Sequence, residues 1–218
     1  MKYAFLLAGF VLGVLIKGAL PFEIELAGGR TDYCCLEDGT WWQSPLGFTG
    51  ETRVPSFEIG ARQKFGAWSV HGAFVDLGAV SANNIAVVPD ADFNKPTLGA
   101  IGRFDALSSV RGILLGGAYR WKDLQAEVGQ LAYRTDWQIT IDCPTGCAGH
   151  VRQNYETLRF RSDVRLSSYL AISYYIDRAF ITWRRFSHID GGGNSSDGQY
   201  ATGLTNGPVN QIMIGVTL

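Results

Sequence analysis

Residues that could carry acid–base chemistry stand close together near the C-terminus. His188, one of three histidines in the chain, comes two positions before Asp190. On an extended strand, residues two apart share a face, so this pair could act on a water molecule as general base and orienting acid. Ser187 would then face the opposite side, which leaves Ser195 and Ser196 as nucleophiles only if their loop folds back. In the structural alternative, Asp190 pairs with His188 and caps the loop.

The four cysteines are the second chemically distinctive set. Cys34 and Cys35 are adjacent, while Cys143 and Cys147 bracket a Pro-Thr-Gly turn. Adjacent cysteines bridge each other only with strain, so we expect either bridges between the two pairs or a small Cys143–Cys147 loop. Four thiolates could also bind zinc. Because an exported chain meets oxidising conditions, we favour disulfides and expect no metal and no cofactor.

The N-terminal segment predicts export. Lys2 precedes an almost unbroken apolar run, residues 4–16. This run is shorter than the roughly 20 residues of a spanning helix and is typical of a secretory signal peptide. We therefore expect a signal peptide at residues 1–19, with an uncleaved anchor as the alternative.

Composition narrows the class of protein. The formal net charge of −1 gives no electrostatic footprint for nucleic acid. Charged residues make up 18% of the chain and aromatic residues 12%, whereas a soluble domain carries about 25% charged residues. This balance favours an outer surface that faces lipid.

Residues 20–218 alternate between strand-like stretches and turns. In the stretch that begins at Phe57, Phe57 and Ile59 share one face while Glu58, Arg62 and Lys64 share the other, which is the two-residue period of a strand. The same period predicts eight strands, at Phe22–Arg30, Phe57–Phe65, Trp68–Gly78, Val110–Trp121, Leu124–Ile141, Leu166–Ile176, Ala179–Ile189 and Pro208–Leu218.

The connections alternate between short and long. Gly66-Ala67, Lys122-Asp123 and Asp177-Arg178 are short turns, and long loops are expected at about 31–56, 79–109, 142–163 and 190–207. Bacterial outer-membrane barrels combine short periplasmic turns with long outer loops, and strands near 10 residues match a tilted membrane crossing. The sequence therefore predicts an all-β, eight-stranded antiparallel up-and-down barrel in the outer membrane of a Gram-negative bacterium. A soluble lipocalin-like barrel or sandwich is the rival architecture.

The polar face of the strands distinguishes the two architectures. It carries Glu58, Arg62, His71, Arg120 and Glu127, which would meet water in a soluble barrel and must fill the interior of a membrane barrel. Eight strands leave an interior just wide enough for side chains. We expect these charges to pair inside.

The region Ala179–Leu218, with His188, a glycine- and asparagine-rich loop and a final strand, resembles the C-terminal region of the PagL-type lipid A deacylases. Those proteins are eight-stranded outer-membrane barrels with a His-x-Ser-Asn motif and a later glutamate. The resemblance implies hydrolysis of an acyl ester of lipid A by a Ser-His-Glu arrangement. His188 matches the family histidine, but Asp190 and Gly191 stand at the serine and asparagine positions, and no glutamate follows.

Arginines near the expected outer rim suggest a lipid partner. Arg184 and Arg185 lie on one expected strand, with Arg159 and Arg161 close to the neighbouring one. Guanidinium groups pair bidentately with phosphate, so these four predict a lipopolysaccharide site, and interior salt bridges are the alternative. We expect a monomer that acts without catalysis through its outer loops or on lipopolysaccharide. A divergent PagL-like deacylase is the second hypothesis and a narrow channel the third.

Overall fold

The structure is a computed structural model, and it describes residues 22–34, 49–87, 101–142, 155–190, 193–195, 201–202 and 206–218. The expected signal peptide lies outside these residues, as do Cys35, Cys143, Cys147 and Ser196. The leader and the disulfide pairing therefore stay predictions, and Cys34 lies exposed just beyond the first strand.

Within the described ranges, no helix is long and apolar enough to cross a membrane.

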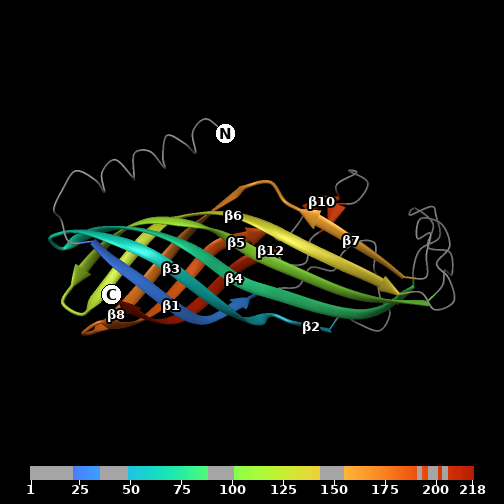
Figure 1. Ribbon diagram of the computed structural model, residues 1–218, viewed down its shortest axis with the longest axis horizontal. Coiled ribbons are helices and arrows are strands. Elements are labelled where there is room, and N and C mark those ends of the chain that lie inside the picture. The colour runs from blue at the N-terminus through green and yellow to red at the C-terminus, as the bar shows by residue number, and fades with distance from the viewer. Residues whose placement is uncertain are drawn as a thin grey trace.

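Eight long strands close into one antiparallel barrel (Figure 1). They are β1 (Phe22–Tyr33), β3 (Arg53–Phe65), β4 (Trp68–Val87), β5 (Ile101–Trp121), β6 (Leu124–Asp142), β8 (Arg165–Ile176), β9 (Ala179–Asp190) and β12 (Asn206–Thr217). Each pairs with the next along the chain, and β1 pairs with β12 from Glu25↔Thr217 to Tyr33↔Val209. Closure leaves none of these strands with an open edge along the barrel wall, as a barrel in lipid requires. The predicted fold class is confirmed.

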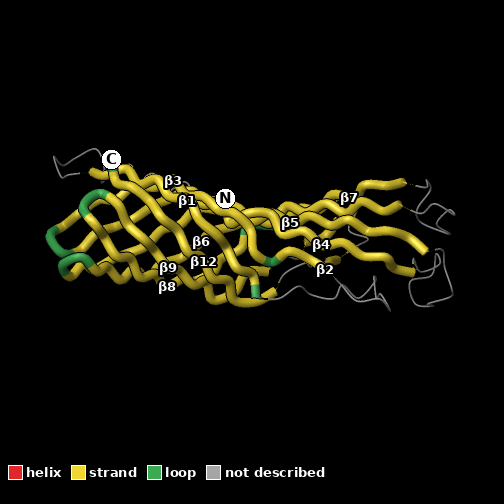
Figure 2. The backbone as a smooth tube through the Cα atoms, turned by 90° about the horizontal axis from the view of Figure 1, so that it is seen from below, coloured by secondary structure: helices red, strands yellow, loops and turns green. Residues whose placement is uncertain are grey.

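Four short strands pair with one another and with the long strands at one end of the barrel. They are β2 (Thr49–Glu51), β7 (Tyr155–Arg161), β10 (Gly193–Ser195) and β11 (Ala201–Thr202). β2 pairs with β4, β7 with β6, and β10 with both β7 and β11. Together with the far ends of β4, β5 and β6 they form a sheet that extends beyond the closed barrel (Figure 2), which we call the projecting sheet.

The three predicted short turns are confirmed and lie together at the end opposite the projecting sheet (Figure 2). Gly66, Lys122 and Asp177 each open a turn with a positive φ, of 67°, 56° and 55°. Two-residue hairpin turns use a positive φ at this position because it matches the twist of the flanking strands.

The expected loop at 79–109 is wrong over much of its length. β4 continues to Val87 and β5 already begins at Ile101, with pairs from Ala79↔Ser109 outward. The pairing register shifts between Asp76 and Ala79, and Gly78 there has a φ of 85°. This β-bulge reverses the in–out alternation. The regular sequence pattern therefore ends at the bulge, although the strand continues beyond it.

The other expected loops are also shorter than the sequence indicated. β1 reaches Tyr33 and β3 starts at Arg53, while β7 occupies part of 142–163 and β10 and β11 part of 190–207.

The outer wall of the barrel is largely apolar, and buried charged side chains lie inside it. The expected two-sided pattern of β3 is confirmed, because Phe57 and Ile59 are exposed whereas Glu58 and Arg62 are buried. The exposed band runs around the whole wall and includes Phe22, Leu26, Phe74, Ile113, Trp121, Val128, Leu170, Ile172, Trp183, Ile212 and Ile214. Exposing an apolar surface of this extent to water is energetically unfavourable. Such a surface is typical of one that is covered by lipid or by another protein.

Two layers of side chains fill the interior. Toward the projecting sheet, the buried residues are mainly apolar and form one cluster that includes Leu77, Val80, Val110, Leu114, Leu131, Trp137, Phe186 and Ile189. Toward the turns, the interior holds buried glutamates, arginines and a histidine. An apolar layer thus separates the charged layer from the projecting sheet.

A charged substitution on the apolar outer wall tests whether lipid covers this surface. Val128 is 61% exposed on the apolar outer wall of β6. If lipid covers this wall, we expect Val128→Arg to lower the free energy of unfolding by about 2–4 kcal/mol. Urea unfolding of the protein in phospholipid vesicles measures this change.

The matched control is Leu107→Arg, because Leu107 is 48% exposed on the outward face of the projecting sheet. There we expect a change within about 0.5 kcal/mol. Equal effects at the two positions would mean that water, not lipid, surrounds Val128.

Candidate functional site

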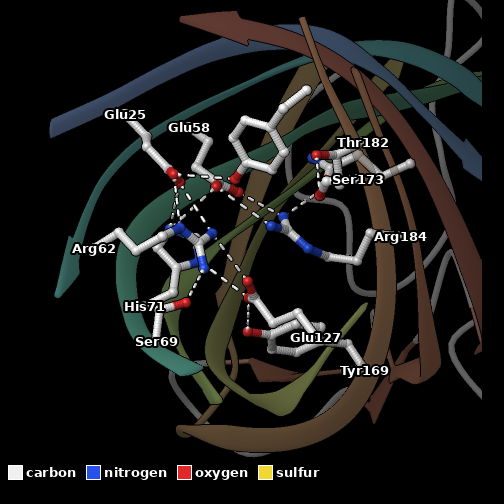
Figure 3. A network of polar contacts seen from close by, with 12 residues as sticks. Glu25, Glu58, Arg62, Ser69, His71, Glu127, Tyr169, Ser173, Thr182 and Arg184 are labelled. Atoms are coloured by element: carbon white, nitrogen blue, oxygen red, sulfur yellow. Dashed lines mark hydrogen bonds and ion pairs between the residues drawn. The ribbon is translucent and has the colours of Figure 1, made fainter. Parts of the chain in front are cut away.

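The charged interior layer is built around Arg62 of β3 (Figure 3). Its Nε donates to Glu25 Oε1 at 2.7 Å and its Nη2 to Glu25 Oε2 at 3.1 Å. Nη2 also donates to Glu127 Oε2 at 3.0 Å, and Nη1 to the Ser69 hydroxyl at 3.2 Å. One guanidinium thereby joins β1, β4 and β6 to β3 across the lumen.

Glu127 collects further donors from two other strands. His71 Nδ1 lies 3.0 Å from Glu127 Oε1, and the Tyr169 hydroxyl donates to the same oxygen at 2.6 Å. His71 Nε2 lies 3.5 Å from Glu25 Oε2 and 3.6 Å from Glu58 Oε1. Gly60 makes room for this ring, since a Cβ there would stand 2.6 Å from His71 Nε2. The expectation that His71 is an interior polar residue is confirmed.

Arg184 belongs to this network and not to an outward lipopolysaccharide site. Its side chain is 3% exposed and forms an ion pair with Glu58, and it donates to Gln211 Oε1 at 2.9 Å. The guanidinium also lies 5.2 Å from the centre of the Tyr169 ring. The prediction failed here because Arg184 and Arg185 are consecutive on a strand, so only one of them can face outward.

The network holds three buried carboxylates against two arginines and a histidine. Each of its glutamates forms an ion pair with at least one arginine, so no carboxylate of the network is buried without a cation beside it. Removing one member of such a set strands a buried charge. Among the described residues, no group of three or more His, Cys, Asp or Glu could hold a metal ion. The ion pairs and hydrogen bonds of the network join strands that are distant in the sequence across the interior of the barrel.

The His188–Asp190 region departs from a regular strand. Across from β12, the pairs Val209↔Phe186 and Gly207↔Ile189 place one extra residue in β9. Ser187 and His188, the residues of this bulge, are both exposed. The sequence could not show this bulge, because it depends on the pairing register with β12.

Partners in this region come mainly from β6 and β8. The Asp190 carboxylate lies 2.7 Å from Arg165 Nη1. The backbone N–H of His188 donates to the Ser167 hydroxyl at 3.3 Å, and Ser167 Oγ lies 3.4 Å from Ser187 Oγ. Arg165 thus competes with His188 for the acid that would orient a catalytic histidine.

The remaining predicted arginines separate into two places. Arg159 and Arg161 lie on β7 and face outward beside β6, whereas Arg185 faces outward on β9. Arg161 forms an ion pair with Asp136 of β6, and this hydrogen bond raises the pKa of the Arg161 guanidinium further above its usual value. The structure therefore keeps two of the four arginines together and sets Arg185 apart.

Sequence reasoning missed two arginines that the register brings to the same outer rim. Arg111 of β5 stands directly opposite Arg134 of β6, and both are exposed. Arg111 donates to Asp76 at 2.8 Å. No sequence signal marks this pair, because 23 positions separate its members and only the hairpin register aligns them.

A closed antiparallel barrel with an apolar wall and paired charges inside is the architecture of membrane-spanning β-barrels. The sequence matches no protein-family model, and no curated protein matches it significantly.

Three solved structures are similar over most of the chain. Ail, the attachment invasion locus protein of Yersinia pestis, is 10% identical with a TM-score of 0.40, covering 90% of this chain and 96% of that one. Neisserial surface protein A is 9% identical with a TM-score of 0.34 and the same two coverages. The outer membrane protease OmpT from Escherichia coli is 11% identical with a TM-score of 0.38, covering 90% and 94%. The function proposed below rests on this chain's own side chains.

Loss of one buried carboxylate tests the interior network. Glu127→Gln leaves Arg62 and His71 without their shared anion, and we expect it to lower the free energy of unfolding by about 3–5 kcal/mol. Urea unfolding in phospholipid vesicles gives the value.

Glu23→Gln is the control, because the Lys64–Glu23 ion pair lies near the turn end with Glu23 25% exposed. We expect it to cost less than about 1 kcal/mol. If Glu127→Gln is as mild as Glu23→Gln, the interior charges are hydrated and the network does not support the barrel.

Proposed function

We propose that this chain is an outer-membrane β-barrel of a Gram-negative cell that acts at the cell surface, without catalysis, through its projecting sheet, its outer loops and contact with lipopolysaccharide. The observation that carries the proposal is the length of three neighbouring strands. β4, β5 and β6 have 20, 21 and 19 residues, whereas a tilted crossing of the bilayer needs about 9–11. Roughly half of each strand is thus available outside the membrane.

The ends of the barrel give its orientation. Outer-membrane barrels place short turns in the periplasm and long connections outside. The turns at Gly66, Lys122 and Asp177 lie at the end opposite the projecting sheet (Figure 2). In this proposal the turns therefore face the periplasm, and the projecting sheet stands above the outer leaflet. A rigid sheet supported by the barrel is a suitable platform for contact with a surface partner.

The filled interior argues against the third hypothesis, a channel. Arg62 and Arg184 reach carboxylates on other strands across the lumen, and a layer that includes Leu114, Leu131 and Phe186 lies beyond them. An ion would have to displace both layers. Eight-stranded barrels in general leave little space for a solvent path.

The PagL-like deacylase is the second candidate, and one observation favours it. The bulge in β9 exposes Ser187 beside His188, with Ser167 close to both. Attack by a serine needs a base beside it and an acid that orients the base. Arg165 holds the nearest such acid, Asp190, at 2.7 Å, which weakens this candidate relative to the non-catalytic one.

Epitope insertion tests the surface location. We expect an epitope placed between Val87 and Ile101 to bind antibody on intact cells, because β4 and β5 lead outward to this connection. The same epitope between Asp177 and Arg178 should become accessible only after the outer membrane is permeabilised. Labelling of the 177–178 insertion on intact cells, with none at the other site, would reverse the orientation and refute the proposal.

Mass spectrometry of lipid A tests the absence of catalysis. Cells that express the chain should contain the same acylated lipid A as cells that express His188→Ala or carry an empty vector, once the protein is shown to be folded in the outer membrane. Loss of one acyl chain that requires His188 would establish the deacylase instead.

A further inference from the structure

Two arginines of like charge stand directly opposite each other on the outer wall. Arg111 of β5 and Arg134 of β6 are cross-strand partners, and side chains at directly opposed positions have Cβ atoms about 4.5–5.5 Å apart. Like charges in this position destabilise a sheet. The pair therefore does not stabilise the barrel, which suggests that the two arginines serve another purpose, such as binding an anion.

Neighbouring acids compensate this pair only in part. Asp76 accepts a hydrogen bond from Arg111 Nε at 2.8 Å, and Asp136 is engaged by Arg161 of β7. Within the described part of the chain, the guanidinium of Arg134 has no hydrogen-bond or ion-pair partner. Arg159, two positions before Arg161, adds another exposed cation to this face. We call Arg111, Arg134, Arg159 and Arg161 the rim arginines.

The distance of the Arg111–Arg134 pair from the turn end of the barrel indicates its depth relative to the proposed membrane. Arg111 lies about ten residues from the turn at Lys122, and Arg134 lies about ten residues from the same turn on the returning strand. On strands tilted by roughly 45° this places both about 25 Å from the turn end, where the apolar band of an outer-membrane barrel finishes. Ile113, the next outward residue toward the turn, is an exposed apolar side chain. The pair thus stands at the level of the outer-leaflet headgroups.

We propose that Arg111 and Arg134 form a clamp for a phosphate group on the headgroup of a phosphorylated outer-leaflet glycolipid of the lipid A type, with Arg161 and Arg159 extending the site. The inference deepens the proposed function and rests on its outer-membrane location. Two adjacent guanidinium groups match the geometry of one phosphate, because each can donate two parallel N–H bonds. The bound anion would turn the repulsion between the arginines into attraction through a shared partner.

Arg134→Gln is the decisive variant, because Arg134 is exposed and makes no side-chain hydrogen bond or ion pair within the described residues. Its control is Arg178→Gln, an exposed arginine in a turn at the opposite end. Native mass spectrometry of the full chain in detergent micelles measures bound lipid A. We expect Arg134→Gln to weaken binding of phosphorylated lipid A by about tenfold or more, and Arg178→Gln to leave it unchanged.

Two further binding experiments distinguish recognition of the whole lipid from recognition of phosphate alone. Dephosphorylated lipid A should bind equally weakly to the natural chain and to Arg134→Gln, and inorganic phosphate should displace lipid A only at far higher concentration than lipid A itself requires. Displacement at comparable concentration would overturn the lipid assignment. Equal affinity of both proteins for phosphorylated lipid A would overturn the clamp.

The sign of the change in stability that Arg134→Gln causes is a second test of the clamp. In vesicles of phosphatidylcholine alone, Arg134→Gln should raise the urea midpoint because it removes the repulsion, and in vesicles that contain phosphorylated lipid A it should lower the midpoint relative to the natural chain. The same sign in both vesicles contradicts the clamp. A chain that does not fold into either vesicle refutes the proposed outer-membrane function itself, which distinguishes that failure from a failure of the phosphate site alone.

Discussion

The pairing of charges inside an apolar wall is the interaction on which the rest of this structure depends. A barrel whose outer surface carries Phe57, Ile113 and Ile214 has to place its charged side chains inward, and an unpaired charge there would cost several kcal/mol. Arg62 meets this constraint by binding Glu25 and Glu127 together. Strands far apart in the chain are thereby held at fixed positions around one guanidinium.

The layered interior follows from the same constraint. Charges occupy the half near the turns, and the apolar cluster with Leu114 and Phe186 occupies the half toward the projecting sheet. Because the apolar layer continues to Val80 and Trp137, the projecting sheet shares a packed core with the barrel. A surface that is continuous with a rigid core presents its outward side chains in a fixed arrangement. This is the physical basis for our proposal that the projecting sheet carries the function.

The sequence predicted the barrel well, because a two-residue period records which side of a strand faces the interior. It predicted less where that period breaks. The bulge at Gly78 interrupted the pattern of β4, and the bulge before Ile189 left both Ser187 and His188 exposed where a regular strand would alternate. For the same reason, contacts that depend on the pairing register of two strands could not be predicted from the sequence. The Arg111–Arg134 pair exists only because one hairpin aligns two distant positions.

Site-directed spin labelling along β12 tests the inverted barrel most directly. Single cysteines at Ile212, Met213 and Ile214, in a chain whose four natural cysteines are serine, would carry the label in phospholipid vesicles. The account predicts that labels at Ile212 and Ile214 collide with dissolved oxygen and are shielded from a water-soluble nickel complex, while the label at Met213 is shielded from both. Collision of the nickel complex with the label at Ile214 would contradict it, because that side chain would then face water.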